Sequence, residues 1–137
     1  MEKKDLKPAG VFKYFEEICQ VPRPSKKEEK MIAYLKAFGA KHNLETKVDE
    51  AGNVLIKKPA TPGKENLQTV VLQSHIDMVC EKNNDVQHDF LTDPIETEID
   101  GEWLKAKGTT LGADNGIGVA TELAILADDS IDHGPLE

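Results

Sequence analysis

The spacing of hydrophobic positions predicts two helices near the start of the chain. Between residues 11 and 19 the apolar side chains recur every three or four positions, which is the repeat of one buried helical face. Two prolines at positions 22 and 24 end this helix, because proline interrupts helical hydrogen bonding. The same spacing recurs over residues 31–38, and we expect this second helix to open with a capping box at residues 25–28.

Beyond the second helix the hydrophobic pattern becomes typical of strands. Residues 44–48 and 54–56 flank a turn rich in Asp, Gly and Asn, which predicts a hairpin. Residues 95–105 alternate around Asp100-Gly101 and predict a second hairpin with one face in water. The segment Thr-Val-Val-Leu-Gln-Ser-His at 69–75 is the strongest strand pattern in the sequence, and we expect it to be a central strand.

The last third of the chain predicts a loop followed by a helix. Residues 108–118 are rich in Gly and polar side chains, and residues 117–127 carry an apolar stripe broad enough to be mostly buried. The loop thus delivers Asp114 to the start of a helix. The order of helices and strands predicts an α/β domain built in layers. Residues 132–137 look like a turn that leads into a further strand, so we expect the chain to be a piece of a larger protein.

Composition excludes several classes of protein. Hydrophobic residues make up 39% and charged residues 31% of the chain, which is an ordinary globular mixture. The net charge of −8 opposes binding to nucleic acid through phosphate. No segment reaches the roughly 18–20 apolar residues that span a bilayer, and the N-terminus lacks a secretory pattern. Cys19 and Cys80 stand apart from each other, which favours two reduced thiols in a cytoplasmic protein.

His75 and Asp77 are the first candidates for chemistry, at the end of the predicted central strand. Alternate residues of an extended strand point to the same side, so the imidazole and the carboxylate can interact directly. A metal-ligating histidine usually has its second ring nitrogen held by a carboxylate or a carbonyl, and Asp77 suits that role. A His-x-Asp pair also arises by chance, and the plainer interpretation is a histidine near a surface acid.

Asp114, within Gly-Ala-Asp-Asn-Gly, also has two interpretations. Taken alone it is typical of a helix cap or a first-turn acid, which satisfies free amides and the positive end of the helix dipole. The alternative is a carboxylate that bridges two metal ions about 3.5–4 Å apart. Because ligands collect at the carboxyl ends of strands in α/β sheets, His75 and Asp114 are expected at one rim of the sheet, which favours the metal interpretation.

Several longer stretches carry a more specific pattern: residues 70–79, 82–90 and 100–103, and above all Gly-Thr-Thr-Leu-Gly-Ala-Asp-Asn-Gly-Ile-Gly at 108–118. Through them the chain resembles the bacterial aminoacyl-histidine dipeptidases from Phe12 to its last residue. These enzymes are a branch of the dizinc metallopeptidases that include glutamate carboxypeptidase, peptidase T and aminoacylase.

The resemblance implies a cytoplasmic metallo-dipeptidase that hydrolyses Xaa-His and other unblocked dipeptides through a metal-bridged water. It implies two zinc ions, with Co or Mn as alternative metals. His75 would be a ligand of one ion and Asp114 would bridge both, while Asp77 would be the catalytic acid that orients His75. The implied fold is the N-terminal part of a three-layer α/β/α domain with a mixed sheet, and the implied full-length protein is a homodimer.

The resemblance also indicates functional parts that are expected beyond Glu137. In the family these are an adjacent Glu-Glu pair that supplies the general base and a zinc ligand, later Asp and His ligands, and an inserted second domain. We therefore expect residues 1–137 to be the N-terminal portion of the catalytic domain, inactive alone and prone to self-association through an exposed sheet edge. A non-catalytic binding or regulatory module on the same scaffold and a purely structural fragment are the alternatives.

Overall fold

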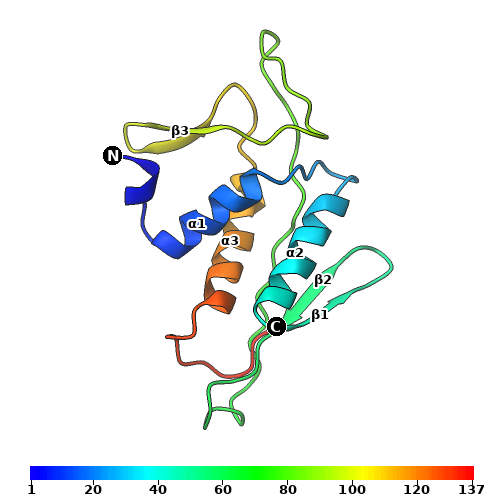
Figure 1. The fold of residues 1–137 in the computed structure, drawn as a ribbon, viewed down its shortest axis with the longest axis vertical. Helices are drawn as coiled ribbons and strands as arrows, with labels where there is room; N and C mark the ends of the chain where they lie inside the picture. The colour runs from blue at the N-terminus through cyan, green and yellow to red at the C-terminus, as the bar shows by residue number, and fades with distance from the viewer.

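The computed structural model describes all 137 residues (Figure 1). In chain order the elements are the 3-10 helix η1 (Lys3–Asp5), α1 (Ala9–Cys19), α2 (Glu29–Lys41), β1 (Glu45–Val48), β2 (Val54–Lys57), β3 (Thr97–Asp100), β4 (Trp103–Ala106) and α3 (Ala113–Ala127). None of the helices combines the length and the apolar character that crossing a membrane requires.

Helices α1 and α3 pack side by side at the centre of the molecule (Figure 1). Ile18 of α1 and Ala120 of α3 have no exposed surface, and Met31 brings α2 into the same core. Burying an aliphatic side chain of this size contributes about 1.5–3 kcal/mol. The full set of clustered buried side chains is Tyr14, Phe15, Ile18, Cys19, Met31, Leu35, Phe38, Ile56, Met78, Ile95, Val119, Ala120, Leu123 and Leu126.

Both predicted hairpins are present. β1 pairs antiparallel with β2, and the carboxylate of Asp49 orders their turn by accepting hydrogen bonds from the amides of Ala51 and Asn53. β3 pairs antiparallel with β4 around Gly101, which has a φ of +60° that glycine adopts without steric cost. The hairpin β3–β4 lies at the opposite side of the molecule from β1–β2 (Figure 1).

Isolated bridges extend the β1–β2 hairpin into a mixed arrangement. Lys58, directly after β2, pairs antiparallel with Leu136, and Leu136 pairs in parallel with Val70. Three backbone hydrogen bonds of 2.8–3.0 Å join residues 70–72 to residues 135–137. Residues 135–137 therefore pair antiparallel on one side and parallel on the other. The predicted α/β class is confirmed.

The segment 69–75 is not the buried central strand that its composition predicts. It runs extended, yet only Val70 forms a bridge, and Val71 is 65% exposed. The physical reason is that its backbone pairs on one edge only, with a partner of three residues. An apolar run can be buried on both faces, but burial also needs neighbouring elements that cover it.

The start of α2 also differs from the prediction. The N-cap residue is Glu28, and no side chain caps the helix. Ser25 is instead engaged by the segment after 69–75, because its hydroxyl donates to the carboxylate of Asp77 at 2.5 Å and to the carbonyl of Met78 at 3.2 Å. The predicted capping box is therefore wrong, because its serine forms hydrogen bonds with Asp77 and Met78, which are distant in the sequence.

Candidate functional site

His75, Asp77 and Asp114 lie in contact, although Asp114 follows His75 by 39 positions. The Nδ1 atom of His75 is 3.0 Å from Oδ1 of Asp77, and its Nε2 atom is 3.0 Å from Oδ1 of Asp114. Nδ1 also lies 3.2 Å from the carbonyl oxygen of Asp77. The imidazole is thus held between two carboxylates, one on each ring nitrogen.

This arrangement shifts the protonation of the imidazole and of one acid. The hydrogen bond to Asp114 raises the pKa of His75, burial acts in the opposite direction, and Asp77 raises the pKa further. The hydrogen bond from Ser25 lowers the pKa of Asp77, and His75 adds to that effect. A neutral imidazole has only one N–H, so with Nδ1–H directed at Asp77 the Nε2 lone pair faces a carboxylate oxygen. Two acceptors at 3.0 Å need a proton or a cation between them.

Asp114 is an acid in the first turn of α3, as the plainer interpretation allowed, but its side chain does not cap the helix. Its backbone and that of Asn115 are non-helical, and no backbone amide donates to the carboxylate of Asp114. Asn115 contacts the helix amides instead, because its Oδ1 accepts from the amide of Gly118 at 3.1 Å. The carboxylate of Asp114 has 98% exposure and only His75 as a partner.

Sequence reasoning missed three residues near this group. Arg23 is only 2% exposed and donates to backbone carbonyls on both sides of the site. Ser25 holds the carboxylate of Asp77, as described above. Glu122 accepts a hydrogen bond of 2.8 Å from the hydroxyl of Ser74, and burial raises its pKa. Glu122 carried a readable signal, because it is the one charged residue in the apolar stripe at 117–127. The pattern at Ser25 pointed to a helix cap, and no sequence pattern singles out Arg23.

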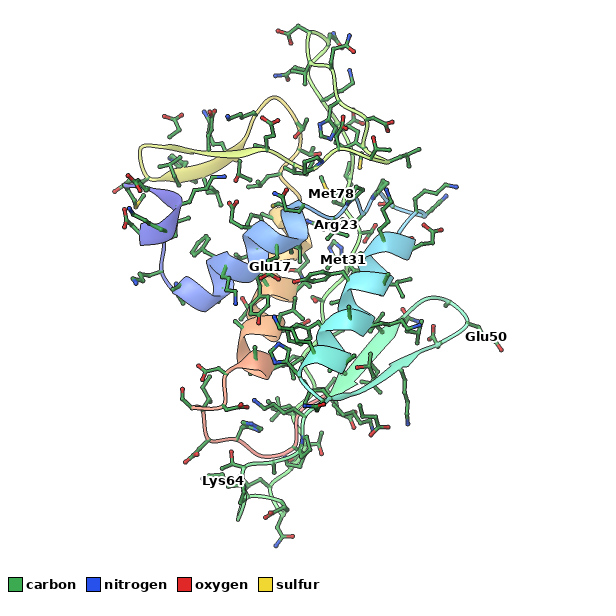
Figure 2. All side chains as sticks on the ribbon, viewed as in Figure 1. Glu17, Arg23, Met31, Glu50, Lys64 and Met78 are labelled. Atoms are coloured by element: carbon green, nitrogen blue, oxygen red, sulfur yellow. The ribbon has the colours of Figure 1, made fainter.

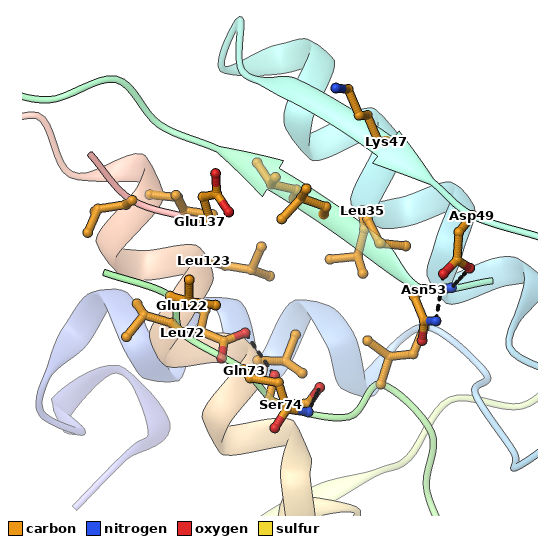
Figure 3. A pocket seen from close by; sticks show the side chains of 18 residues that line it. Leu35, Lys47, Asp49, Asn53, Leu72, Gln73, Ser74, Glu122, Leu123 and Glu137 are labelled. Atoms are coloured by element: carbon orange, nitrogen blue, oxygen red, sulfur yellow. Dashed lines mark hydrogen bonds between the residues drawn. The ribbon is translucent and has the colours of Figure 1, made fainter. Parts of the chain in front are cut away.

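Two cavities flank the segment that carries His75. One, of about 460 Å³, lies between the β1–β2 hairpin and α3 and is mainly apolar; Leu35, Leu72 and Leu123 line it together with the Ser74–Glu122 pair (Figure 3). The other, also about 460 Å³, includes His75 and Asp77 themselves with the turn between β1 and β2. Both volumes are in the range of about 300–1,000 Å³ that small-molecule sites occupy.

His75 and Asp114 offer the kinds of donor atom that zinc prefers. Zinc binds imidazole nitrogen and carboxylate oxygen at about 2.0–2.2 Å in tetrahedral geometry, which puts neighbouring ligand atoms about 3.3 Å apart. The 3.0 Å between His75 Nε2 and Asp114 Oδ1 is close to that separation, and Asp77 holds the other ring nitrogen as a second partner does in such sites. No group of three or more His, Cys, Asp or Glu side chains is placed to hold a metal. The chain therefore fits part of a zinc site.

Comparison with known proteins gave two close matches, while no family model matches the chain. The chain is 52% identical to the cytosol non-specific dipeptidase of Escherichia coli over 136 residues, which is 99% of this chain. The crystal structure of aminoacylhistidine dipeptidase from Vibrio alginolyticus superposes with a TM-score of 0.95 at 54% identity, again over 99% of the chain. The resemblance to the aminoacylhistidine dipeptidases is confirmed. The chain spans 28% of the length of each of these relatives.

More distant structures share the fold. A tripeptidase from Staphylococcus aureus has a TM-score of 0.73, and the aminopeptidase PepT from Bacillus cereus has one of 0.74. Each is 22% identical and covers 93% of this chain and 34% of its own. At this identity the likeness concerns the fold alone, and it agrees with the predicted α/β class.

Proposed function

We propose that this chain contributes His75, Asp77 and Asp114 to the active site of a cytoplasmic, zinc-dependent dipeptidase. The observation that carries the proposal is the imidazole of His75 held at 3.0 Å by a carboxylate on each ring nitrogen. The similarity to two dipeptidases at 52% and 54% identity supports it. Residues 1–137 would be the N-terminal portion of the catalytic domain, with further ligands and the general base elsewhere in the full-length protein.

In this proposal each residue has one task. His75 would hold a zinc ion through Nε2, and Asp114 would be the carboxylate that two zinc ions share. Asp77 fixes the ring of His75 by accepting from Nδ1–H. Zinc, when bound, polarises a carbonyl and lowers the pKa of water. Ser25 keeps Asp77 in its ionised form through the short hydroxyl contact, so the acid remains an acceptor for the imidazole.

The proposed substrates are Xaa-His and other short unblocked dipeptides. The cavity that includes His75 and Asp77 also has Glu28, Asn53 and Gln73 in its wall, so it offers polar groups to a charged peptide end. A site of this kind, with a few polar groups beside a candidate metal ligand, is the common form of a small-molecule site. Nucleic acid and membranes are not proposed as partners, and the full-length protein is proposed to be a homodimer.

The test uses the full-length gene product. We expect it to hold two zinc ions after dialysis and to hydrolyse an Xaa-His dipeptide, with His75→Ala losing one zinc and Asp114→Ala losing both. Asp129→Ala is the matched control, because Asp129 is a 94% exposed acid beyond the opposite end of α3. Retention of two tightly bound zinc ions in Asp114→Ala would show that the roles are wrongly assigned.

The isolated 137-residue chain is expected to hydrolyse no dipeptide and to bind zinc weakly. It places at most His75 and Asp114 on a metal, whereas catalytic zinc usually has three protein ligands. The measurements are zinc titration calorimetry and an assay of Xaa-His cleavage against a His75→Ala control. Nanomolar zinc affinity, or zinc-dependent cleavage above that control, would contradict the proposal.

A further inference from the structure

We propose that Arg23 is a positioning residue that fixes the His75–Asp77 segment against the loop carrying Asp114. This inference rests on the function proposed above, because it concerns the geometry of the same site. Arg23 follows α1 and lies beside Met78 in the interior of the molecule (Figure 2). It is 2% exposed, so its guanidinium is removed from water.

The guanidinium joins the two segments that carry the candidate metal ligands. Its Nη1 atom donates to the carbonyls of Ile76 and Asp77 at 3.3 Å each, and its Nη2 atom donates to the carbonyl of Gly112 at 2.7 Å. Gly112 comes two residues before Asp114, whereas Ile76 and Asp77 directly follow His75. One rigid planar fork therefore sets the separation of the two backbones on which the site is built.

The backbone of Arg23 is attached to the same segment as its side chain. The amide of Met78 donates to the carbonyl of Arg23 at 3.0 Å, and the amide of Ser25 donates to the carbonyl of Met78 at 3.2 Å. These bonds form a parallel bridge between residues 23–25 and 77–78. Because these bonds hold the backbone of Arg23 in place, the position from which its side chain extends to Gly112 is fixed.

Two glycines around Asp114 leave the space that this guanidinium occupies. A Cβ atom on Gly112 would lie 2.6 Å from Nη2 of Arg23, and a Cβ atom on Gly116 would lie 2.7 Å from the same nitrogen. Neither distance is possible without displacing the arginine. The arginine is thus one reason for glycine at both positions, and at Gly112 a φ of +74° and the nearby Sδ of Met78 favour glycine as well.

Stability is a poor explanation for this arginine. It forms no ion pair with a carboxylate, and all its hydrogen-bond partners are backbone carbonyls. A buried charge without an acidic partner is costly to remove from water. What the three bonds provide is a defined distance between the two segments of the site.

The first test compares Arg23→Met with Lys58→Met in the full-length protein. Lys58 is the control because it is also buried, at 8% exposure, and donates to a backbone carbonyl, that of Asp128 beyond the far end of α3. It differs from Arg23 in that it also pairs with the exposed carboxylate of Asp129 at 3.3 Å. We expect Arg23→Met to lower zinc affinity and kcat about 10–100-fold, as loss of a partner behind a metal ligand does, with KM changed less than about twofold. Lys58→Met is expected to leave both unchanged.

The second test uses Gly116→Ala, which pushes on the guanidinium without removing it. We expect a smaller loss of zinc affinity in the same direction, and a much smaller effect of Gly116→Ala when Arg23 is already Met, because the two changes act through one contact. Arg23→Lys is expected to recover part of the loss, since one ammonium cannot occupy both Nη positions. These variants keep the inference testable if Arg23→Met folds poorly.

A metal-free readout separates this inference from the proposed function. In the zinc-free Arg23→Met variant, the amide hydrogens of residues 76–78 and 112–116 should exchange with solvent faster than in the unchanged protein. The amide hydrogens of α1 should keep their protection from exchange. Unchanged exchange in those segments, or equal losses of zinc affinity in Arg23→Met and Lys58→Met, would overturn the inference. Faster exchange in a protein that binds no zinc would uphold the positioning role and refute the proposed function.

Discussion

At the scale of single residues, the site depends on what surrounds each ionisable group. His75 is half exposed, yet it has a carboxylate at each ring nitrogen and its pKa is raised by the hydrogen bond to Asp114 and then by Asp77. Asp77 is held by a hydroxyl, by the imidazole and, through its carbonyl, by Arg23. These contacts come from separate parts of the chain, so they hold the site residues in place only in the folded protein.

The first prediction concerns Asp77→Asn in the full-length protein. The amide still fills the space, but it removes the negative charge that orients and supports the imidazole of His75. Zinc affinity or activity should fall about 10–100-fold, which competition with a chelator and dipeptide turnover would measure. Full activity and unchanged zinc affinity in this variant would contradict the role given to Asp77.

The second prediction concerns pH and Glu122. Burial raises the folded-state pKa of this carboxyl above its unfolded value of about 4.3. The folded state therefore binds the proton more tightly, and stability is lost as the pH rises from the unfolded pKa through the folded one. Glu122→Gln should raise the urea midpoint at pH 7 and give little gain at pH 4. The exposed Glu102, replaced by Gln in the same way, should show no such pH-dependent gain.

At the scale of secondary-structure elements, α3 serves both the core and the site. Its first residues carry Asp114, the helix packs on α1, and Ala120 and Leu123 are among its buried core residues. Leu123 is 2% exposed, whereas Ile117 on the same helix is 38% exposed. The packing of the helix therefore fixes the direction in which its first residues are presented to His75.

The third prediction uses this contrast within one helix. Leu123→Ala should lower the free energy of unfolding by about 2–5 kcal/mol, because it leaves a void in the core. Ile117→Ala should change it by about 0.5 kcal/mol, as substitutions at exposed positions do. Denaturant unfolding of both variants measures the difference, and equal effects would show that α3 is not packed as described.

At the scale of the whole molecule, the two edges of the mixed sheet differ. β1 forms one outer edge and carries Glu45 and Lys47, which discourage pairing with another chain. The other edge is formed by residues 70–72, which pair with 135–137 and lie within the uncharged stretch Leu-Gln-Thr-Val-Val-Leu-Gln-Ser at 67–74. The amides of Val71 and Gln73 donate no hydrogen bond there. An uncharged, apolar and unpaired edge of this kind favours association.

The fourth prediction is that the isolated chain self-associates through this edge with a second copy of itself. Val71→Lys should lower the mass measured by light scattering at high concentration, because pairing of two such edges would bury the charge of the lysine. Ile131→Lys is the control, since Ile131 is a 42% exposed apolar residue outside any strand. A monomeric mass for the unchanged chain at every concentration would count against the prediction.

The sequence by itself determined the local elements and the candidates for chemistry. α1, α2, both hairpins and α3 follow from the repeat of apolar positions and from turn residues such as Asp100-Gly101, which act over a few neighbours along the chain. His75 and Asp77 were within reach of sequence reasoning for the same reason, because two-residue spacing in an extended segment puts them on one side.

Tertiary structure alone decided which groups meet across long separations. It left 69–75 exposed because only 135–137 pair with it, and it directed Ser25 to Asp77 instead of to the helix that follows. It also placed Arg23 between two backbones and turned Asp114 from its helix toward His75. Hydrogen bonds and burial depend on distance in space, which local spacing does not specify once the partners lie tens of residues apart.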